Sequence, residues 1–294
     1  MRDDTQIIKS LPLIQQGKVR DIYQIDDDNL LMITSDRISA FDVVLPTPLP
    51  NKGRILTSIA KFWMNKFADI VPNHLNPSLS LKKILTDKKE YEYANGRAMI
   101  VKKLKPLKIE AIVRGYIIGS GWEDYQKTGK VCGIELQKNL KLAQKLEKNI
   151  FTPSTKADIG DHDQNISYQK AQEIIGADLA KKVRDISLKL YQKAADYADK
   201  KGITIADTKF EFGEDENNNL YLIDEVLTPD SSRFWDKNSY QIGISPKSFD
   251  KQFIRDYLLK IKWNKTAPAP ELPTDIVKKT TDKYKSALDK ITGT

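Results

Sequence analysis

The sequence contains little of what metal centres, disulfide frameworks and membrane spans are built from. Its 294 residues include one cysteine, Cys132, and two histidines. A single cysteine excludes an internal disulfide, and so few histidines leave almost no candidates for a Cys/His zinc site or a hydrolytic triad. Apolar runs such as residues 30–33 are far too short to span a bilayer. The N-terminal stretch MRDDTQIIKS carries acids where a signal peptide needs a basic start, so we expect a cytoplasmic protein.

The charge is uneven along the chain. There are 48 basic and 40 acidic residues, a net charge of +8. Such a basic chain is typical of nucleic-acid-binding proteins. However, residues 207–236 hold nine acids and two bases, a net charge of −7, which leaves +15 for the rest. An acidic segment in a basic chain is typical of a site for metal ions and phosphates. Chance together with one acidic turn would give the same net charge.

Hydrophobic periodicity predicts strands mainly in the first hundred residues and more helix afterwards. The expected strands are residues 18–25, 30–35, 99–103, 109–113, 203–212 and 220–227, with a hairpin turn at 26–29. The expected helices are residues 57–68, 167–175, 178–201, 248–260 and 274–291, and a capping box predicts a further one starting at Ser120. A lobe boundary is expected near Pro106, giving a mainly β lobe at 1–105 and a mixed lobe at 106–294.

The predicted hairpin at 203–227 carries most of the chemistry. Because side chains alternate along a strand, Asp207, Lys209 and Glu211 share one face, opposite an aromatic face formed by Phe210 and Phe212. A register with Lys209 opposite Asp224 would gather the charged residues, whereas a one-residue slip would separate them. Carboxylates gathered beside a lysine suit Mg²⁺ and a nucleotide phosphate. An ordinary solvated hairpin with a cross-strand ion pair remains the alternative.

A second candidate site is the segment RGYIIGSGW at residues 114–122. Gly119 and Gly121 flank Ser120 where a strand leads into a helix, and the N-terminus of a helix binds anions readily. Arg114 could converge on the same anion. The alternative is that Ser120 merely caps its helix together with Glu123. Further along, Arg233 follows a turn next to the acids of the 207–236 segment and could clamp a carboxylate or phosphate.

Several segments together resemble one family. They are GKVRDIY (17–23), TSDRISAFDVVLP (34–46), NKGRILT (51–57), RGYIIGSGW (114–122), FTPSTKADIGDHD (151–163), DTKFEFG (207–213) and DEVLTPDSSRFW (224–235). In this order they resemble the phosphoribosylaminoimidazole-succinocarboxamide synthase (SAICAR synthetase) family, in its longer form. The resemblance covers residues 15 to about 260, and the last two segments alone are nearly diagnostic.

The resemblance implies an ATP-dependent ligase of purine biosynthesis. It would join L-aspartate to carboxyaminoimidazole ribonucleotide (CAIR) through an acyl phosphate, with ATP and Mg²⁺, giving the succinocarboxamide SAICAR, ADP and phosphate. The implied fold is α/β (α+β), with two lobes, an antiparallel sheet in the N-terminal lobe and ATP between the lobes.

The resemblance also implies roles for particular residues. Lys209 and Asp207 would be catalytic, and Glu211 and Asp224 would bind Mg²⁺ at the ATP site. Lys18 and Lys102 would contact ATP. The implied substrate-binding residues are Asp36, Asp42, Arg114, Ser120, Lys156, Asp163 and Arg233.

Two other functions remain open at this point. One is a nucleic-acid-binding module, although the aromatic residues lie mostly on core-like faces rather than among clustered lysines. The other is a different ATP-dependent carboxylate–amine ligase on a related fold. For the favoured function we expect small-molecule partners only, no membrane association, and a monomer or small homo-oligomer.

Overall fold

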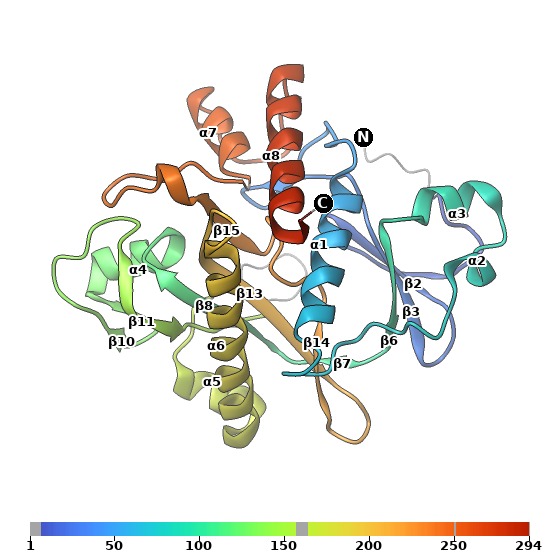
Figure 1. Ribbon diagram of the computed structural model, residues 1–294, viewed down its shortest axis with the longest axis horizontal. Coiled ribbons are helices and arrows are strands. Elements are labelled where there is room, and N and C mark those ends of the chain that lie inside the picture. Colours follow the sequence, from blue (N-terminus) through green and yellow to red (C-terminus); the bar gives the residue numbers. More distant parts are fainter. Residues whose placement is uncertain (1–6, 157–163, 250, 294) are drawn as a thin grey trace. The chain divides into compact units, whose positions relative to one another are not determined.

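A computed structural model describes residues 7–156, 164–249 and 251–293, which fold as two compact units. The first unit comprises Met1–Phe62, His74–Leu104 and Phe249–Thr294, and the second comprises Trp63–Asn73 and Lys105–Ser248 (Figure 1). Each unit therefore combines separate stretches of sequence. The division into lobes at 1–105 and 106–294 stays a prediction.

The first unit contains a four-stranded antiparallel sheet. Its strands, in spatial order, are β1 (Leu13–Gln16), β2 (Arg20–Gln24), β3 (Asn29–Thr34) and β6 (Ala98–Lys102). The predicted hairpin of β2 and β3 is confirmed, with Ile22 opposite Met32. Tyr23, Leu31 and Ile33 are buried in the core beneath this sheet. The alternation of buried and half-buried residues along β2 is what a sheet with one covered face produces.

Five helices and a two-stranded ribbon complete this unit. The helices are α1 (Lys52–Lys66), α2 (Leu81–Ile84), α3 (Lys88–Ala94), α7 (Gln252–Lys260) and α8 (Thr274–Thr292), and the ribbon pairs β4 (Ser39–Ala40) with β5 (Val43–Val44). The last turn of α1 belongs to the second unit. Helix α1 begins before the predicted start at residue 57, because Asp36 accepts a 2.9 Å hydrogen bond from the Gly53 N–H in its first turn. A Cβ on Gly53 would lie 2.1 Å from the Thr34 carbonyl oxygen, so only glycine fits.

The second unit is built around two long neighbouring strands, β8 (Ile109–Tyr116) and β13 (Ile203–Glu214). They pair antiparallel with Asp207 opposite Arg114. β8 also pairs with β11 (Lys145–Phe151) and β12 (Ser154–Thr155), and β13 pairs with β7 (Lys105–Pro106), β14 (Leu220–Ile223) and β15 (Ser232–Asp236). Almost every residue of the two central strands is buried, as expected for strands covered on both faces.

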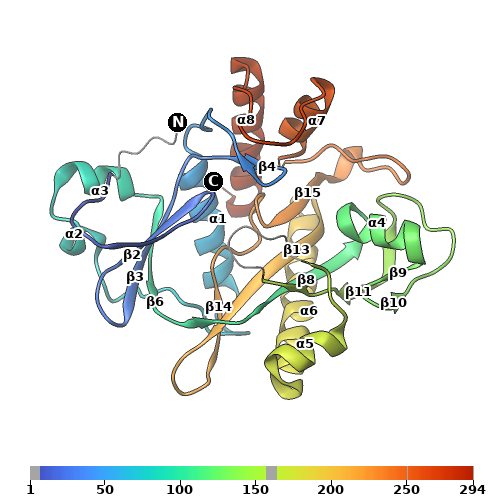
Figure 2. The ribbon, with the colours of Figure 1, turned by 180° about the vertical axis from the view of Figure 1, so that it is seen from behind.

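Helices cover this second sheet. α6 (Ala177–Asp199) lies along β13, β8 and β11 (Figure 2), and its predicted apolar stripe is confirmed, with Val183, Leu190 and Ala194 fully buried. The Tyr191 hydroxyl donates a 2.6 Å hydrogen bond to the Ile205 carbonyl. The remaining elements are α4 (Gly119–Thr128), the ribbon of β9 (Lys130–Val131) and β10 (Ile134–Glu135), α5 (Tyr168–Ile175) and a 3₁₀ turn, η1 (Lys237–Ser239).

The mixture of helices with antiparallel sheets confirms the expected α+β class. Ser167 is the N-cap of α5, because its side chain accepts a hydrogen bond from the Lys170 N–H, and Gly176 ends the helix. Both ends agree with the helix predicted at 167–175. Among the described residues, none of the helices combines the length and the apolar character that crossing a bilayer requires.

His74 is a buried base in the first unit. It is 2% exposed, and among the described residues its Nε2 atom has no hydrogen-bond partner. Burial, with a smaller contribution from the nearby Arg20 charge, lowers the pKa of His74 from 6.5 to about 3. The folded chain therefore keeps this imidazole neutral in mildly acidic solution, whereas the unfolded chain protonates it.

We expect acid to destabilise the protein through His74. The folded-state pKa lies below the unfolded value, so the stabilisation is complete above pH 6.5 and falls as the pH drops toward 3. One proton bound only by the unfolded chain changes the free energy of unfolding by up to about 1.4 kcal/mol per pH unit. Urea unfolding at several pH values, for the wild type and for His74→Phe, measures this. Equal pH slopes in the two proteins would contradict the assignment.

Candidate active site

The predicted hairpin forms, but with a different register. β13 and β14 pair with Glu211 opposite Ile223, where β14 ends, so Lys209 is not opposite Asp224 as the gathering register required. Asp224 follows with a φ of 62°, a left-handed conformation that turns the chain out of the strand. The expected faces of β13 are nonetheless right: Phe210 and Phe212 are buried in the core, and the charged side chains meet partners of opposite charge.

Two arginines converge on Asp207. Arg114 is 2% exposed, its guanidinium lies 2.9 Å from Asp207 Oδ2, and Arg233 contacts the same oxygen. Arg114 also donates hydrogen bonds to Thr152 Oγ1 at 3.0 Å and to Ser120 Oγ at 3.1 Å. Burial lowers the pKa of Arg114 and the Arg233 charge lowers it further, while Asp207 opposes both. Two guanidiniums facing one carboxylate leave local positive charge, which suits an anionic ligand.

Two glycines make room for these arginines. A Cβ on Gly119 would lie 2.2 Å from Arg233 Nη2, and one on Gly121 would lie 3.1 Å from Arg114 Cδ. Gly119 also has a φ of +58°, a left-handed conformation that favours glycine. The predicted capping box is wrong: the N-cap of α4 is Ile118, without a side-chain hydrogen bond, because Ser120 instead accepts from Arg114. We call Arg114, Arg233 and Asp207 the arginine cluster. The GSG sequence at 119–121 therefore makes room for this cluster and contacts it.

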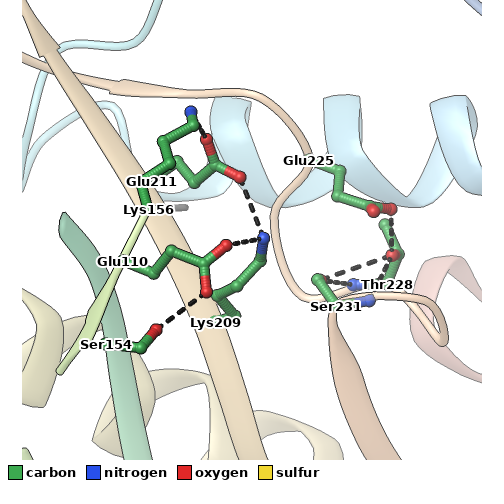
Figure 3. Close-up of polar contacts among 8 residues, drawn as sticks. All are labelled: Glu110, Ser154, Lys156, Lys209, Glu211, Glu225, Thr228 and Ser231. Atoms are coloured by element: carbon green, nitrogen blue, oxygen red, sulfur yellow. Dashed lines mark hydrogen bonds and ion pairs between the residues drawn. The ribbon is translucent and has the colours of Figure 1, made fainter. Parts of the chain in front are cut away.

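Lys209 is the centre of a second cluster on the same strand (Figure 3). Its Nζ atom lies 2.5 Å from Glu110 Oε1 and 2.9 Å from Glu211 Oε1. The second oxygen of Glu211 accepts a 2.5 Å hydrogen bond from Lys156, and that of Glu110 accepts a 2.9 Å hydrogen bond from Ser154. Glu110 and Glu211 are buried, so their charges require these partners.

The electrostatics of this cluster favour the charged forms of its members. Burial works to lower the pKa of Lys209, but the carboxylates of Glu211, Glu110 and Asp224 raise it by more, to well above its ordinary value. Burial works to raise the pKa of Glu211, but Lys209 and Lys156 lower it by more, to well below its ordinary value. Lys209 is therefore a permanent cation, and Glu211 a permanent anion, near neutral pH.

The loop after β14 is held against β13 by its own side chains. Thr228 Oγ1 donates a 2.5 Å hydrogen bond to Glu225, and Ser231 Oγ accepts a 3.1 Å hydrogen bond from the Thr228 N–H (Figure 3). The Ser231 carbonyl oxygen then accepts a 2.9 Å hydrogen bond from the Lys209 N–H. These contacts fix the chain just before Arg233, so that its side chain reaches Asp207.

The other predicted site residues lie in the first unit or outside the described residues. Lys18 and Asp42 form a 2.6 Å ion pair with both side chains more than half exposed. Asp36 is committed to the fold, because it pairs with Arg97 at 3.1 Å besides receiving the Gly53 N–H. Lys102 ends β6 and is exposed. Asp163 lies outside the described residues.

Sequence reasoning missed two residues with clear positions. Glu110 was not recognised, although a single acid in the apolar run IEAIV was a signal. Arg37 was also missed. It pairs with Asp21 at 2.7 Å and donates to the carbonyl oxygens of Gly17 at 3.1 Å and Lys18 at 3.2 Å, which fixes the turn that carries Lys18.

Glu211 and Asp224 are the residues expected to bind Mg²⁺, and their surroundings can be compared with what this ion requires. Glu211 and Asp224 supply the hard oxygen donors that Mg²⁺ prefers, together with phosphate oxygens. In the described residues, no group of three or more His, Cys, Asp or Glu side chains is arranged to hold a metal ion. Both oxygens of Glu211 accept hydrogen bonds from ammonium groups. The donor chemistry therefore fits an ion held mainly by its substrate.

An α+β fold in which guanidinium, ammonium and carboxylate groups gather along one central strand is typical of an enzyme that acts on phosphorylated and carboxylated small molecules. Comparison with known proteins identifies which enzyme class this is. A family model described as SAICAR synthetase matches residues 13–270. The chain belongs to the SAICAR synthetase family, and it is an ATP-dependent carbon–nitrogen ligase of purine biosynthesis.

Curated relatives and solved structures agree with this. Phosphoribosylaminoimidazole-succinocarboxamide synthases from Thioalkalivibrio sulfidiphilus and Cupriavidus metallidurans are each 57% identical, over 97% of this chain and 96% of theirs. A Saccharomyces cerevisiae SAICAR synthase in complex with SAICAR has a TM-score of 0.91 and 45% identity, covering 99% of this chain and 97% of that one. A SAICAR synthetase in complex with ADP has a TM-score of 0.69 and 26% identity, covering 95% and 97%.

Gly119→Ala should lower kcat/KM of the ligase by about tenfold or more, because the new methyl group must displace the Arg233 guanidinium. Gly129→Ala is the matched control. Gly129 ends the same helix with a φ of +71°, but a Cβ there meets nothing within 4 Å. Both variants should lose comparable thermal stability from backbone strain, about 1 kcal/mol. Steady-state kinetics and thermal melts separate the effects, and equal activities would contradict the role of Gly119.

Proposed function

We propose that this chain joins L-aspartate to CAIR, with ATP, to give SAICAR, ADP and phosphate. A carboxylate oxygen of CAIR would attack the γ-phosphorus of ATP and release ADP, forming an acyl phosphate. The aspartate amine would then attack the acyl carbon, and phosphate would leave. The observation that carries this proposal is the row of charged clusters on β13, since cations of fixed charge are what phosphoryl transfer between anions requires.

The arginine cluster is proposed to hold the ribonucleotide phosphate. Arg114 and Arg233 supply a local excess of positive charge over Asp207, and their side chains are already oriented by buried contacts. Such preorganisation lowers the entropic cost of binding. Ser120 would complete the site, because its oxygen is fixed by Arg114 beside the N-terminus of α4. Asp207 is thereby a residue that orients both arginines.

The lysine cluster is proposed to serve phosphoryl transfer. Lys209, a permanent cation, would face the negative charge that develops on the transferred phosphoryl group. Glu211 and Asp224 would hold Mg²⁺, which when bound neutralises phosphate charge. Lys156 would then leave Glu211 and bind a substrate carboxylate instead. A carboxylate is already the partner of the exposed Lys156 ammonium.

The remaining roles rest on the family resemblance. Lys18 and Lys102 are proposed to contact ATP, with Arg37 fixing the backbone turn beneath Lys18. Asp42 and Asp163 are proposed for the imidazole and aspartate pockets, and Asp36 would act there by holding its loop, since its carboxylate pairs with Arg97. A cytoplasmic location, the absence of nucleic-acid and membrane partners, and a monomer or small homo-oligomer stay predictions.

The purified protein should release phosphate from ATP only when aspartate and CAIR are both present. A coupled phosphate assay, run with each substrate omitted in turn and with glutamate or alanine in place of aspartate, measures this. Phosphate release with another amino acid, and none with aspartate, would favour a different carboxylate–amine ligase. Binding to DNA that outcompetes ATP would favour the nucleic-acid function.

Glu211→Gln should lower kcat by about a hundredfold and shift the Mg²⁺ dependence to higher concentrations, because a neutral amide is a weak ligand for this ion. The fold should survive, since the amide can still accept from Lys209. Glu214→Gln, three residues along β13 at a half-buried position, is the matched control. Mg²⁺ titrations of the initial rate compare the two, and an unchanged Mg²⁺ dependence in Glu211→Gln would exclude the metal role.

A further inference from the structure

Glu110 is a buried carboxylate whose two oxygens have different tasks. It lies on β8, with its residue 5% exposed, between the buried Ile109 and Ala111. One oxygen receives the Lys209 ammonium at 2.5 Å, and the other receives the Ser154 hydroxyl at 2.9 Å from the neighbouring strand β12, where Ser154 is directly opposite Glu110 (Figure 3). The serine thereby fixes the plane of the carboxylate and aims the first oxygen at Lys209.

Lys209 has two close anionic partners, and the second oxygen of each carboxylate has a different partner. Glu211 shares its carboxylate between Lys209 and the exposed Lys156. Under the proposed function, this carboxylate must also turn to Mg²⁺, which weakens its hold on Lys209. The other oxygen of Glu110 is held by the hydroxyl of the buried Ser154. A buried charge left without its partner is strongly unfavourable, so Glu110 and Lys209 hold each other in place.

We propose that Glu110 is a positioning residue for the ligation reaction: held by Ser154, it keeps the Lys209 ammonium in place and aimed while Glu211 engages other cations. This inference rests on the proposed role of Lys209. It explains why a charged residue stands in the middle of an apolar strand. It also separates the two glutamates, one serving the substrates and the other serving the lysine.

The test combines kinetics with the chemical reactivity of Lys209. In Glu110→Gln, kcat should fall by about tenfold or more while the KM for aspartate stays within about twofold, because Lys209 acts on the transition state. Without the Glu110 carboxylate, the Lys209 ammonium loses one of its two close ion-pair partners. Lys209 should therefore be acetylated faster by acetic anhydride, measured by peptide mass spectrometry with the exposed Lys138 as internal reference.

A double-mutant cycle shows whether Glu110 acts through Lys209. Combining Glu110→Gln with Lys209→Met should lower kcat no further than Lys209→Met alone. The control is Glu135→Gln, which breaks the exposed ion pair with Lys130 and should change neither kcat nor the reactivity of Lys209. If Glu110→Gln does not fold, Ser154→Ala keeps the carboxylate and removes its support, and should shift kcat and acetylation in the same direction by about threefold.

The outcomes distinguish this inference from the function on which it rests. Full activity in Lys209→Met would overturn the proposed role of Lys209 itself. An inactive Lys209→Met together with wild-type kcat and acetylation in Glu110→Gln would overturn only the positioning role. Additive losses of kcat in the double variant would show that Glu110 acts independently of Lys209. A lower melting temperature with unchanged kcat would show that Glu110 serves stability alone.

Discussion

Charges buried along β13 must each be neutralised, and this requirement organises the second unit. Asp207 is matched by Arg114 from β8 and Arg233 from β15, and Lys209 is matched by Glu110, again from β8. Because an unpaired buried charge is far more costly than a lost surface contact, these pairs specify which strands lie beside β13. The backbone register, with Asp207 opposite Arg114, then follows the same pairing. The same charge pairs therefore hold the strands of this sheet together and form the candidate active site.

Space is the second constraint. The arginine side chains can reach Asp207 only because residues 119 and 121 lack a Cβ, and the first turn of α4 forms without the usual side-chain cap. The start of α4 therefore lacks a stabilising cap at the place where the arginine side chains need room. In the first unit, Gly53 similarly allows the start of α1 to approach the end of β3 closely, and Asp36 accepts a hydrogen bond from the Gly53 N–H. Gly53, Gly119 and Gly121 are therefore required by the atoms that lie against them.

Much of the secondary structure could be predicted because its causes are local. The turn between β2 and β3, the serine that caps α5 and the apolar stripe of α6 each depend on residues within a few positions of one another. The failures have other causes. Ser120 has the pattern of a cap, but its oxygen accepts from Arg114, which is held in place by Asp207 on a strand distant in sequence. The β13–β14 register depended on a loop whose length leaves several registers open.

The sequence by itself determined the family and the kind of chemistry, because ordered motifs and residue types survive without coordinates: carboxylates beside a lysine, and arginine beside glycines. Only the tertiary structure decided which charges meet. Lys209 and Glu110 are 99 positions apart, and Arg114 and Asp207 are 93 apart. No local pattern encodes such a contact, since it depends on how strands from distant segments align. For the same physical reason, the importance of Glu110 and the structural commitment of Asp36 emerge only in the folded chain.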